Sequence, residues 1–310
     1  MGKGSGYGKT ILFGEHFVVY GLPAIASALG STTTAEVKRA DINGYELIDN
    51  RPETAGYKEQ KKEEYEKLIE NVIKFMEVKE GIRITLGGNL VAASGVGASA
   101  ACAAALARAI NNEFRLDWND DKINEAAFEG EKGPHGTPSG IDNTAAVFGG
   151  LLLFKKNLGG NQNTIKKMKL RKPVEIVLGN SGKTSSTKEV VGDVRRLEEE
   201  QPKKINAVFE EYGALVEEAK KALKDYDLKK VGTLMNKNHE LLQKITVSSS
   251  ELDEMVETAR NAGALGAKLT GTGRGGLMIA LTPGKNLQEK VAEAIEAQGY
   301  TVFRSKIGGS

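Results

Sequence analysis

The segment Ser94-Gly95-Val96-Gly97-Ala98-Ser99 runs directly into the alanine-rich stretch Ala100–Ile110. Alanine has the highest helix propensity, so this stretch predicts a helix that begins at the glycine-rich segment. A helix N-terminus presents unpaired backbone N–H groups and a partial positive charge, and glycine lets a ligand approach the backbone. A plain loop-to-helix cap would have the same pattern, but the segment is also a candidate phosphate loop. The residues of this loop are Gly95, Val96, Gly97, Ala98 and Ser99.

A second constrained segment contains a carboxylate near its end. It is His135-Gly136-Thr137-Pro138-Ser139-Gly140-Ile141-Asp142-Asn143, and we expect an ordered loop that holds Asp142 on a restricted backbone. A kinase that acts on an alcohol needs a positioned base, which contributes roughly 100- to 10,000-fold in rate. Asp142 is therefore a candidate base. The alternative is that Asp142 and Ser139 only bind backbone groups of a turn.

Two oxygen-bearing side chains near these segments suit a magnesium ion. Glu131 precedes the second segment, and we expect the Ser99 hydroxyl in the first turn of the predicted helix. Hard cations bind carboxylate oxygens together with substrate phosphates. The alternative for Glu131 is an ordinary exposed position, because it lies in the charged run Glu129-Gly130-Glu131-Lys132.

A third segment lies near the N-terminus. Gly8-Lys9 precedes the apolar residues Ile11–Phe13, and Gly14-Glu15-His16 separates these from the apolar residues Phe17–Tyr20. We expect two strands joined by a short polar turn. A lysine near the reacting groups would stabilise negative charge on the transferring phosphoryl oxygens.

The same region resembles a Walker A loop, but two features exclude that interpretation. The motif requires a first glycine where this chain has Lys3. The motif also joins a strand to a helix, whereas no strand is predicted before Gly4–Thr10 and a strand is predicted after it.

A fourth segment, Thr270-Gly271-Thr272-Gly273-Arg274-Gly275-Gly276, lies between the predicted strands Lys268–Thr270 and Leu277–Leu281. It would serve as a hairpin turn. A glycine-dense loop of this length also lets the backbone surround a ligand.

The rest of the chain mixes helices and strands, which predicts an α+β protein. A cap is expected where Ser250 precedes Asp253 by one helical turn. A domain boundary is placed in the lysine-rich segment, giving domains at residues 1–170 and 171–310. The other predicted elements are a helix over 63–78, a strand over 82–86, a hairpin or linker over 155–172, a strand over 175–178, helices over 193–244 and a helix that opens at Ser250.

Composition excludes several classes of protein. The 310 residues include 43 basic and 41 acidic ones, a balance that argues against nucleic-acid binding. Cys102 is the single cysteine, so no disulfide forms within the chain, and three histidines argue against a zinc site. No apolar run has the length of a membrane span or a signal peptide, so we expect a cytoplasmic protein without a membrane partner.

The four segments, in this order, resemble the motifs of the GHMP kinases, a superfamily named for galactokinase and for homoserine, mevalonate and phosphomevalonate kinases. The resemblance spans Gly8 to Gly276. Lys9–Gly21 and the H-G-T-P-S-G-I-D-N-T segment are most similar to the branch that phosphorylates mevalonate. The resemblance implies a two-domain α+β GHMP kinase fold with the active site in the cleft between the domains. It also implies mevalonate and ATP as substrates, Mg²⁺ as cofactor and a homodimer as a possible assembly.

The resemblance also implies roles for individual residues. Asp142 would be the catalytic base, and Lys9 would stabilise the transition state and the substrate hydroxyl. Ser99 and Glu131 would bind Mg²⁺. His16 would offer a hydrogen bond or a charge to the mevalonate carboxylate. The substrate-binding residues would be Glu15, His16, Thr187 and Thr272.

Three positions depart from the usual family motifs. Ala98 replaces a serine in G-L-G-S-S-A, and Gly6-Tyr7-Gly8 replaces A-P-G before the lysine. Thr272 and Arg274 are substituted into G-A-G-G-G. Arg274 either points to solvent or places a positive charge near the phosphates.

The motifs leave two alternatives to mevalonate phosphorylation. One is another GHMP kinase with galactose or phosphomevalonate as the acceptor. The other is a non-catalytic nucleotide-binding protein of the same fold, but such a protein should have lost Asp142 or Lys9, and both are present.

Overall fold

The computed structural model describes residues 1–93, 95–135, 138–159, 163–183 and 185–308. The chain forms two compact units that are each discontinuous in sequence. Unit 1 contains Met1–Lys9 and Ala28–Gly149, and unit 2 contains Thr10–Ser27 and the chain from Gly150 onward. Both units mix strands and helices, which confirms the predicted α+β class. The division into domains at residues 1–170 and 171–310 stays a prediction.

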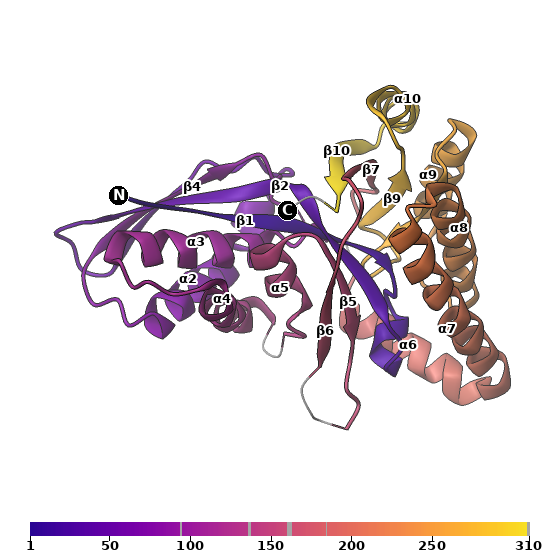
Figure 1. The fold of residues 1–310 in the computed structure, drawn as a ribbon, viewed down its shortest axis with the longest axis horizontal. Helices are drawn as coiled ribbons and strands as arrows, with labels where there is room; N and C mark the ends of the chain where they lie inside the picture. The colour runs from indigo at the N-terminus through magenta and orange to yellow at the C-terminus, as the bar shows by residue number, and fades with distance from the viewer. Residues whose placement is uncertain (94, 136–137, 160–162, 184, 309–310) are drawn as a thin grey trace. The chain divides into compact units, whose positions relative to one another are not determined.

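Unit 1 is a sheet with helices packed on one face (Figure 1). Strand β2 pairs with β1 and, in antiparallel register, with β4, which in turn pairs with β3 in parallel. Strands β1 and β2 continue into unit 2. The strands are β1 (Gly2–Phe13), β2 (Ala24–Arg39), β3 (Tyr45–Asp49) and β4 (Ile82–Gly88), and the helices are α1 (Tyr57–Gln60), α2 (Lys62–Phe75), α3 (Ala98–Phe114), α4 (Asp120–His135) and α5 (Ile141–Phe148).

Alternate glycines let β1 lie directly against helix α3. The missing side chains of Gly2, Gly4 and Gly6 all face α3, and a Cβ added at Gly4 would lie 2.3 Å from the Ala105 carbonyl oxygen. A real Cβ does not approach another atom so closely, so the contact requires glycine. The glycine pattern near the N-terminus is therefore explained by packing within one strand, in agreement with the rejection of a Walker A loop.

The predicted helix over 63–78 is confirmed as α2, and its apolar stripe is buried. Leu68, Ile69 and Val72 are fully buried in a cluster that also contains Ile82 and Ile84 of β4. The predicted strand over 82–86 is likewise confirmed, as β4.

Unit 2 contains an antiparallel sheet with the strand order β10-β7-β9-β8, together with a β5–β6 hairpin (Figure 1). The first residues of β2, Ala24–Ser27, pair with β5. The strands are β5 (Leu151–Lys155), β6 (Thr164–Met168), β7 (Val174–Asn180), β8 (Gly266–Thr270), β9 (Leu277–Leu281) and β10 (Thr301–Ile307), and the helices are α6 (Thr187–Glu200), α7 (Pro202–Asp225), α8 (Leu228–Lys244), α9 (Ser250–Asn261) and α10 (Lys285–Glu296).

The prediction of a second strand over Phe17–Tyr20 is wrong, because these residues form a short 3-10 helix, η1. The spacing of three residues brings Phe17 and Tyr20 to the same side, where both rings contact Phe209 of α7. Gly21, at φ 74°, ends the turn. The Phe17 ring also stacks on Tyr212, with ring centroids 4.0 Å apart. Packing against α7 therefore explains why this apolar run is not extended.

The predicted cap of α9 also needs correction. Ser249, and not Ser250, is the N-cap, and its side chain accepts a hydrogen bond from Leu252 N. Asp253 instead accepts a hydrogen bond from the Ser248 hydroxyl and contacts Nε2 of His239.

In the described part of the chain, no helix has the length and apolar character needed to cross a membrane.

Candidate active site

Lys9 lies at the end of the part of β1 that belongs to unit 1. Its backbone N–H donates a hydrogen bond of 2.7 Å to the Val96 carbonyl oxygen in the phosphate loop. Its side-chain Nζ lies 2.9 Å from Oδ1 of Asp142. The strand therefore positions one lysine against both the glycine-rich loop and the candidate base.

The candidate phosphate loop turns into α3 at Gly97, which has φ 69° and precedes the first helical residue, Ala98. A Cβ at Gly97 would lie 3.1 Å from the Cβ of Lys9, so glycine suits both the left-handed backbone and the narrow space. Gly97 has no side chain to cap the first N–H groups of α3. Ser94, the first residue of the motif, lies outside the described residues.

Glu131 is only 1% exposed, which rules out the interpretation as a surface residue of a charged run. The pKa of its carboxyl is raised to about 8, mainly by burial and also by the nearby Asp142 charge, although a hydrogen bond with Ser99 and the charge of Lys9 oppose the shift. Two carboxylates and a hydroxyl therefore share a small space. Such a set of oxygen donors fits a divalent cation, which would favour the ionised form of both carboxylates.

The backbone of Asp142 is constrained differently from the prediction. Asp142 lies in the first turn of α5, which follows Gly140 at φ 86°, and not in a loop. The Thr144 hydroxyl donates a 2.6 Å hydrogen bond to the Gly140 carbonyl oxygen and reinforces this turn. Helix geometry therefore fixes the direction of the Asp142 side chain. Gly136 and Thr137 of the same motif lie outside the described residues.

In unit 2, Glu15 forms a fully buried ion pair with Lys268 of β8. Burial raises the pKa of Glu15, and it lowers the pKa of Lys268, while the attraction between the two groups opposes both shifts. Lys268 Nζ also donates a hydrogen bond of 2.6 Å to the Leu269 carbonyl oxygen. The lysine therefore fixes one oxygen of Glu15 in place.

Thr272 contacts two of the other predicted substrate residues of unit 2. Its carbonyl oxygen accepts a hydrogen bond from Nε2 of His16. Its hydroxyl lies 2.8 Å from the hydroxyl of Thr187, the first residue of α6. The structure therefore brings His16, Thr187 and Thr272 together, with Glu15 next to His16 in the chain.

Two buried acceptor atoms in this group have no hydrogen-bond partner among the described residues: Oε2 of Glu15 and Nδ1 of His16. Because Nε2 of His16 donates to Thr272, Nδ1 of the neutral ring carries a lone pair. Burial lowers the pKa of His16, and the positive charge of Arg274 lowers it as well, which favours this neutral form. Buried unpaired acceptors are costly, so these two atoms are suited to a ligand that donates hydrogen bonds.

Sequence reasoning missed two residues that support this group. Lys268 lies in a segment that is predicted only as a strand, although a lysine in the short run Ala267-Lys268-Leu269-Thr270 is a sequence signal of a buried charge. Tyr212, fully buried, donates a 2.7 Å hydrogen bond to the Pro23 carbonyl oxygen and stacks on Phe17. The sequence contains no comparable signal for Tyr212, because its partners are distant in the chain.

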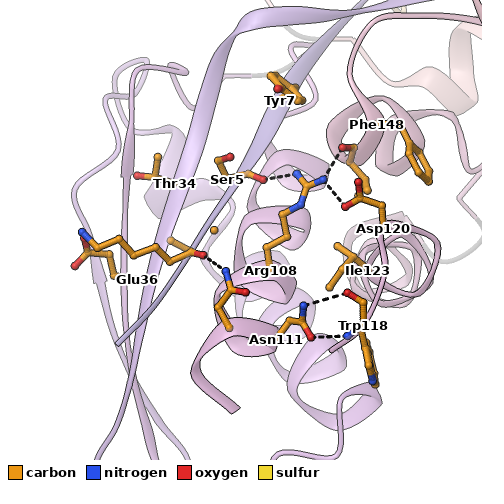
Figure 2. Close-up of a pocket in the computed structure, with 15 residues that line it drawn as sticks. Ser5, Tyr7, Thr34, Glu36, Arg108, Asn111, Trp118, Asp120, Ile123 and Phe148 are labelled. Atoms are coloured by element: carbon orange, nitrogen blue, oxygen red, sulfur yellow. Dashed lines mark hydrogen bonds and ion pairs between the residues drawn. The ribbon is translucent and has the colours of Figure 1, made fainter. Parts of the chain in front are cut away.

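Unit 1 also contains a polar cavity of about 840 Å³ that includes none of the predicted site residues (Figure 2). Arg108 of α3 points toward Ser5 and Asp120, and it donates hydrogen bonds to the carbonyl oxygens of Ser5 and Val147, both 2.8 Å long. Asn111 exchanges two hydrogen bonds with the backbone of Trp118. These groups connect α3 to its neighbours in unit 1.

Two protein-family models match this chain. The family model "GHMP kinases N terminal domain" matches residues 65–150, and "GHMP kinases C terminal" matches residues 219–301. The chain belongs to the GHMP kinase family.

Several relatives within the family share most of their length with this chain. The mevalonate kinase of Pyrococcus abyssi is 36% identical in a match that covers 96% of this chain and 93% of that protein. The crystal structure of L. major mevalonate kinase in complex with R-mevalonate is 38% identical, covers 100% of this chain and 97% of its own, and has a TM-score of 0.95. The Methanococcus jannaschii mevalonate kinase structure is 25% identical, with a TM-score of 0.82 and coverage of 99% and 98%.

Proposed function

We propose that this protein transfers the γ-phosphoryl group of ATP to the 5-hydroxyl of mevalonate, giving 5-phosphomevalonate for isoprenoid biosynthesis. Similarity to mevalonate kinases over nearly the whole chain supports the choice of acceptor. The observation that carries the proposed chemistry is the 2.9 Å contact between Lys9 and Asp142 beside the glycine-capped start of α3.

Asp142 accepts the proton of the 5-hydroxyl as that oxygen attacks the γ-phosphorus of ATP. Lys9 stabilises the negative charge that develops on the attacking and transferring oxygens. The phosphate groups bind at the N-terminus of α3, where backbone N–H groups are available. Positioning and charge stabilisation suffice for phosphoryl transfer, which needs little covalent chemistry from the protein.

Glu131 and Ser99 are the residues that would hold Mg²⁺. A bound Mg²⁺ ion would neutralise part of the negative charge of the phosphate oxygens. Burial and the nearby Asp142 charge favour the neutral form of the Glu131 carboxyl. A bound cation would favour its ionised form, which suits Glu131 to this role.

Glu15 and His16 bind mevalonate through its hydroxyl groups. The available atoms, Oε2 of Glu15 and Nδ1 of His16, are acceptors, and a neutral histidine that accepts hydrogen bonds does not bind a carboxylate. We therefore assign His16 to a hydroxyl of the substrate and not to its carboxylate. Thr187 and Thr272 contribute hydroxyl groups that are able to donate or accept.

The product distinguishes this reaction from the alternatives. ³¹P NMR of a reaction containing ATP, Mg²⁺ and mevalonate should show one new phosphomonoester coupled to the methylene protons at C5. Phosphorylation at the tertiary 3-hydroxyl would lack that coupling, and no new signal would indicate a non-catalytic protein.

The homodimer and the cytoplasmic location stay predictions.

A further inference from the structure

The loop between β8 and β9 contains one residue whose backbone is unusual. Gly271, Gly273, Gly275 and Gly276 have positive φ angles, and Arg274 among them has φ 51°. The left-handed region is strained for a residue with a Cβ, and glycine avoids this strain. An arginine at this position therefore needs compensating contacts.

The side chain of Arg274 supplies such contacts within unit 2. Its guanidinium forms an ion pair with Asp193 of α6. It also donates hydrogen bonds to the carbonyl oxygen of Thr246, at 2.9 Å, and to the Thr246 hydroxyl, at 3.2 Å. Its backbone N–H donates to the Val247 carbonyl oxygen at 2.9 Å. Arg274 therefore does not simply point to solvent. Its guanidinium is also not left unpaired for binding phosphate groups.

These contacts attach α6 to the loop at a second point. The first point is the hydrogen bond between Thr187, at the start of α6, and Thr272. Asp193 lies further along the same helix and pairs with Arg274. Thr272 in turn accepts the hydrogen bond from His16. A change at Arg274 would therefore reach Thr272, Thr187 and His16, three of the four residues to which the proposed function assigns the acceptor.

We propose that Arg274 is a positioning residue, which ties the loop 271–276 to α6 and thereby sets the affinity for the phosphoryl acceptor. This inference rests on the proposed function of the same group of residues. Arg274 does not touch the substrate; it acts through Thr272. The positive charge of Arg274 is also one cause of the lowered pKa of His16, which agrees with an acceptor role for that ring.

The variant Arg274→Gly provides the sharpest test. Glycine removes the side-chain contacts but fits the left-handed backbone, so the thermal unfolding temperature should be kept. The KM for mevalonate should rise about fivefold, the effect expected from a partly exposed ion pair. The KM for ATP and kcat should change much less. Asp193→Asn should raise the KM for mevalonate in the same direction, and the double variant should add little to Arg274→Gly.

Arg196→Ala is a matched control. Arg196 pairs with the same Asp193 on α6, but it is 72% exposed and makes no contact with the loop in the described structure. Its removal should leave both KM values unchanged. An equal effect of Arg196→Ala and Arg274→Gly would contradict the proposal, because it would assign the effect to α6 alone.

Two further outcomes would overturn the inference. An unchanged KM for mevalonate in Arg274→Gly would exclude a positioning role. A rise in the KM for ATP alone would assign Arg274 to the phosphates. If the unaltered protein fails to phosphorylate mevalonate, the proposed function is wrong, and hydrogen exchange tests the attachment separately. Residues 270–277 and 187–193 should then exchange faster in Arg274→Gly, and equal exchange would contradict the attachment.

Discussion

The ammonium group of Lys9 and the carboxylate of Asp142 lie 2.9 Å apart, although one belongs to an N-terminal strand and the other to the first turn of α5. Both side chains are partly shielded, at 12% and 31% exposure. The pair combines a group that stabilises negative charge with a group that accepts a proton. Both are needed where an alcohol attacks a phosphoryl group.

Replacing Asp142 with asparagine should lower kcat by roughly 100-fold or more, because the amide does not accept the proton of the acceptor. Binding of mevalonate, measured by calorimetry, should stay nearly intact. Asp120→Asn is the control, since Asp120 is a carboxylate of the same unit that pairs with Arg108. Full activity of Asp142→Asn would remove the base from the mechanism.

Replacing Glu131 with glutamine, or Ser99 with alanine, should raise the Mg²⁺ concentration needed for half-maximal activity by about 10-fold or more. The physical reason is the loss of an oxygen donor from a buried set. Glu129→Gln is a matched control, because Glu129 lies on the same helix but pairs with Lys132 at the surface. An unchanged magnesium dependence in both variants would exclude them as ligands.

The close contact between β1 and α3 makes a prediction about stability. Gly4→Ala would place a Cβ 2.3 Å from the Ala105 carbonyl oxygen and should lower the free energy of unfolding by about 1 to 3 kcal/mol. Gly192→Ala should do the opposite and stabilise α6 by about 0.5 to 1 kcal/mol, because a Cβ there meets no other atom within 4 Å. Urea denaturation measures both, and equal effects would contradict the packing argument.

The imidazole of His239 should stay neutral at pH values well below 6.5, the ordinary pKa of a histidine. Its Nδ1 accepts a hydrogen bond of 3.2 Å from the Leu269 backbone N–H, and its Nε2 lies 3.0 Å from Oδ1 of Asp253. Burial lowers its pKa to about 4, with the charges of Arg260 and Lys268 contributing, although Asp253 opposes the shift. Protonation at Nδ1 would break the hydrogen bond from Leu269.

The sign of the pH effect follows from this shift. Between pH 6.5 and 4 the unfolded chain binds a proton at His239 and the folded chain does not, so stability is present above pH 6.5 and falls as the pH decreases. The contribution lost by pH 4.5 is about 2 kcal/mol. NMR of the His239 ring should show no titration above pH 5, and a midpoint near 6.5 would contradict this account.

Much of the candidate catalytic group in unit 1 could be predicted from sequence, because its residues lie in short motifs with distinctive backbone needs. Gly95–Ser99 before an alanine-rich stretch indicated a helix start, and α3 begins at Ala98. The constrained backbone of Asp142 was also indicated, although its origin in α5 was not.

Other features depend on contacts between distant segments and were not accessible from local pattern. An apolar run as short as Phe17–Tyr20 fits a strand or a turn of helix, and only the rings of α7 decide between them. The buried partner of Glu15 is Lys268, which lies almost at the other end of the chain. The role of Arg274 could likewise not be read from local sequence, because it depends on the ion pair with Asp193 of α6.

The acceptor of the phosphoryl group is the central claim. ATP-dependent release of ADP should be measured with mevalonate, phosphomevalonate, galactose and homoserine under identical conditions. The proposed function predicts turnover with mevalonate alone. Turnover with another member of this set and not with mevalonate would contradict the assignment of Glu15 and His16, and no turnover with any of the four would contradict the kinase assignment itself.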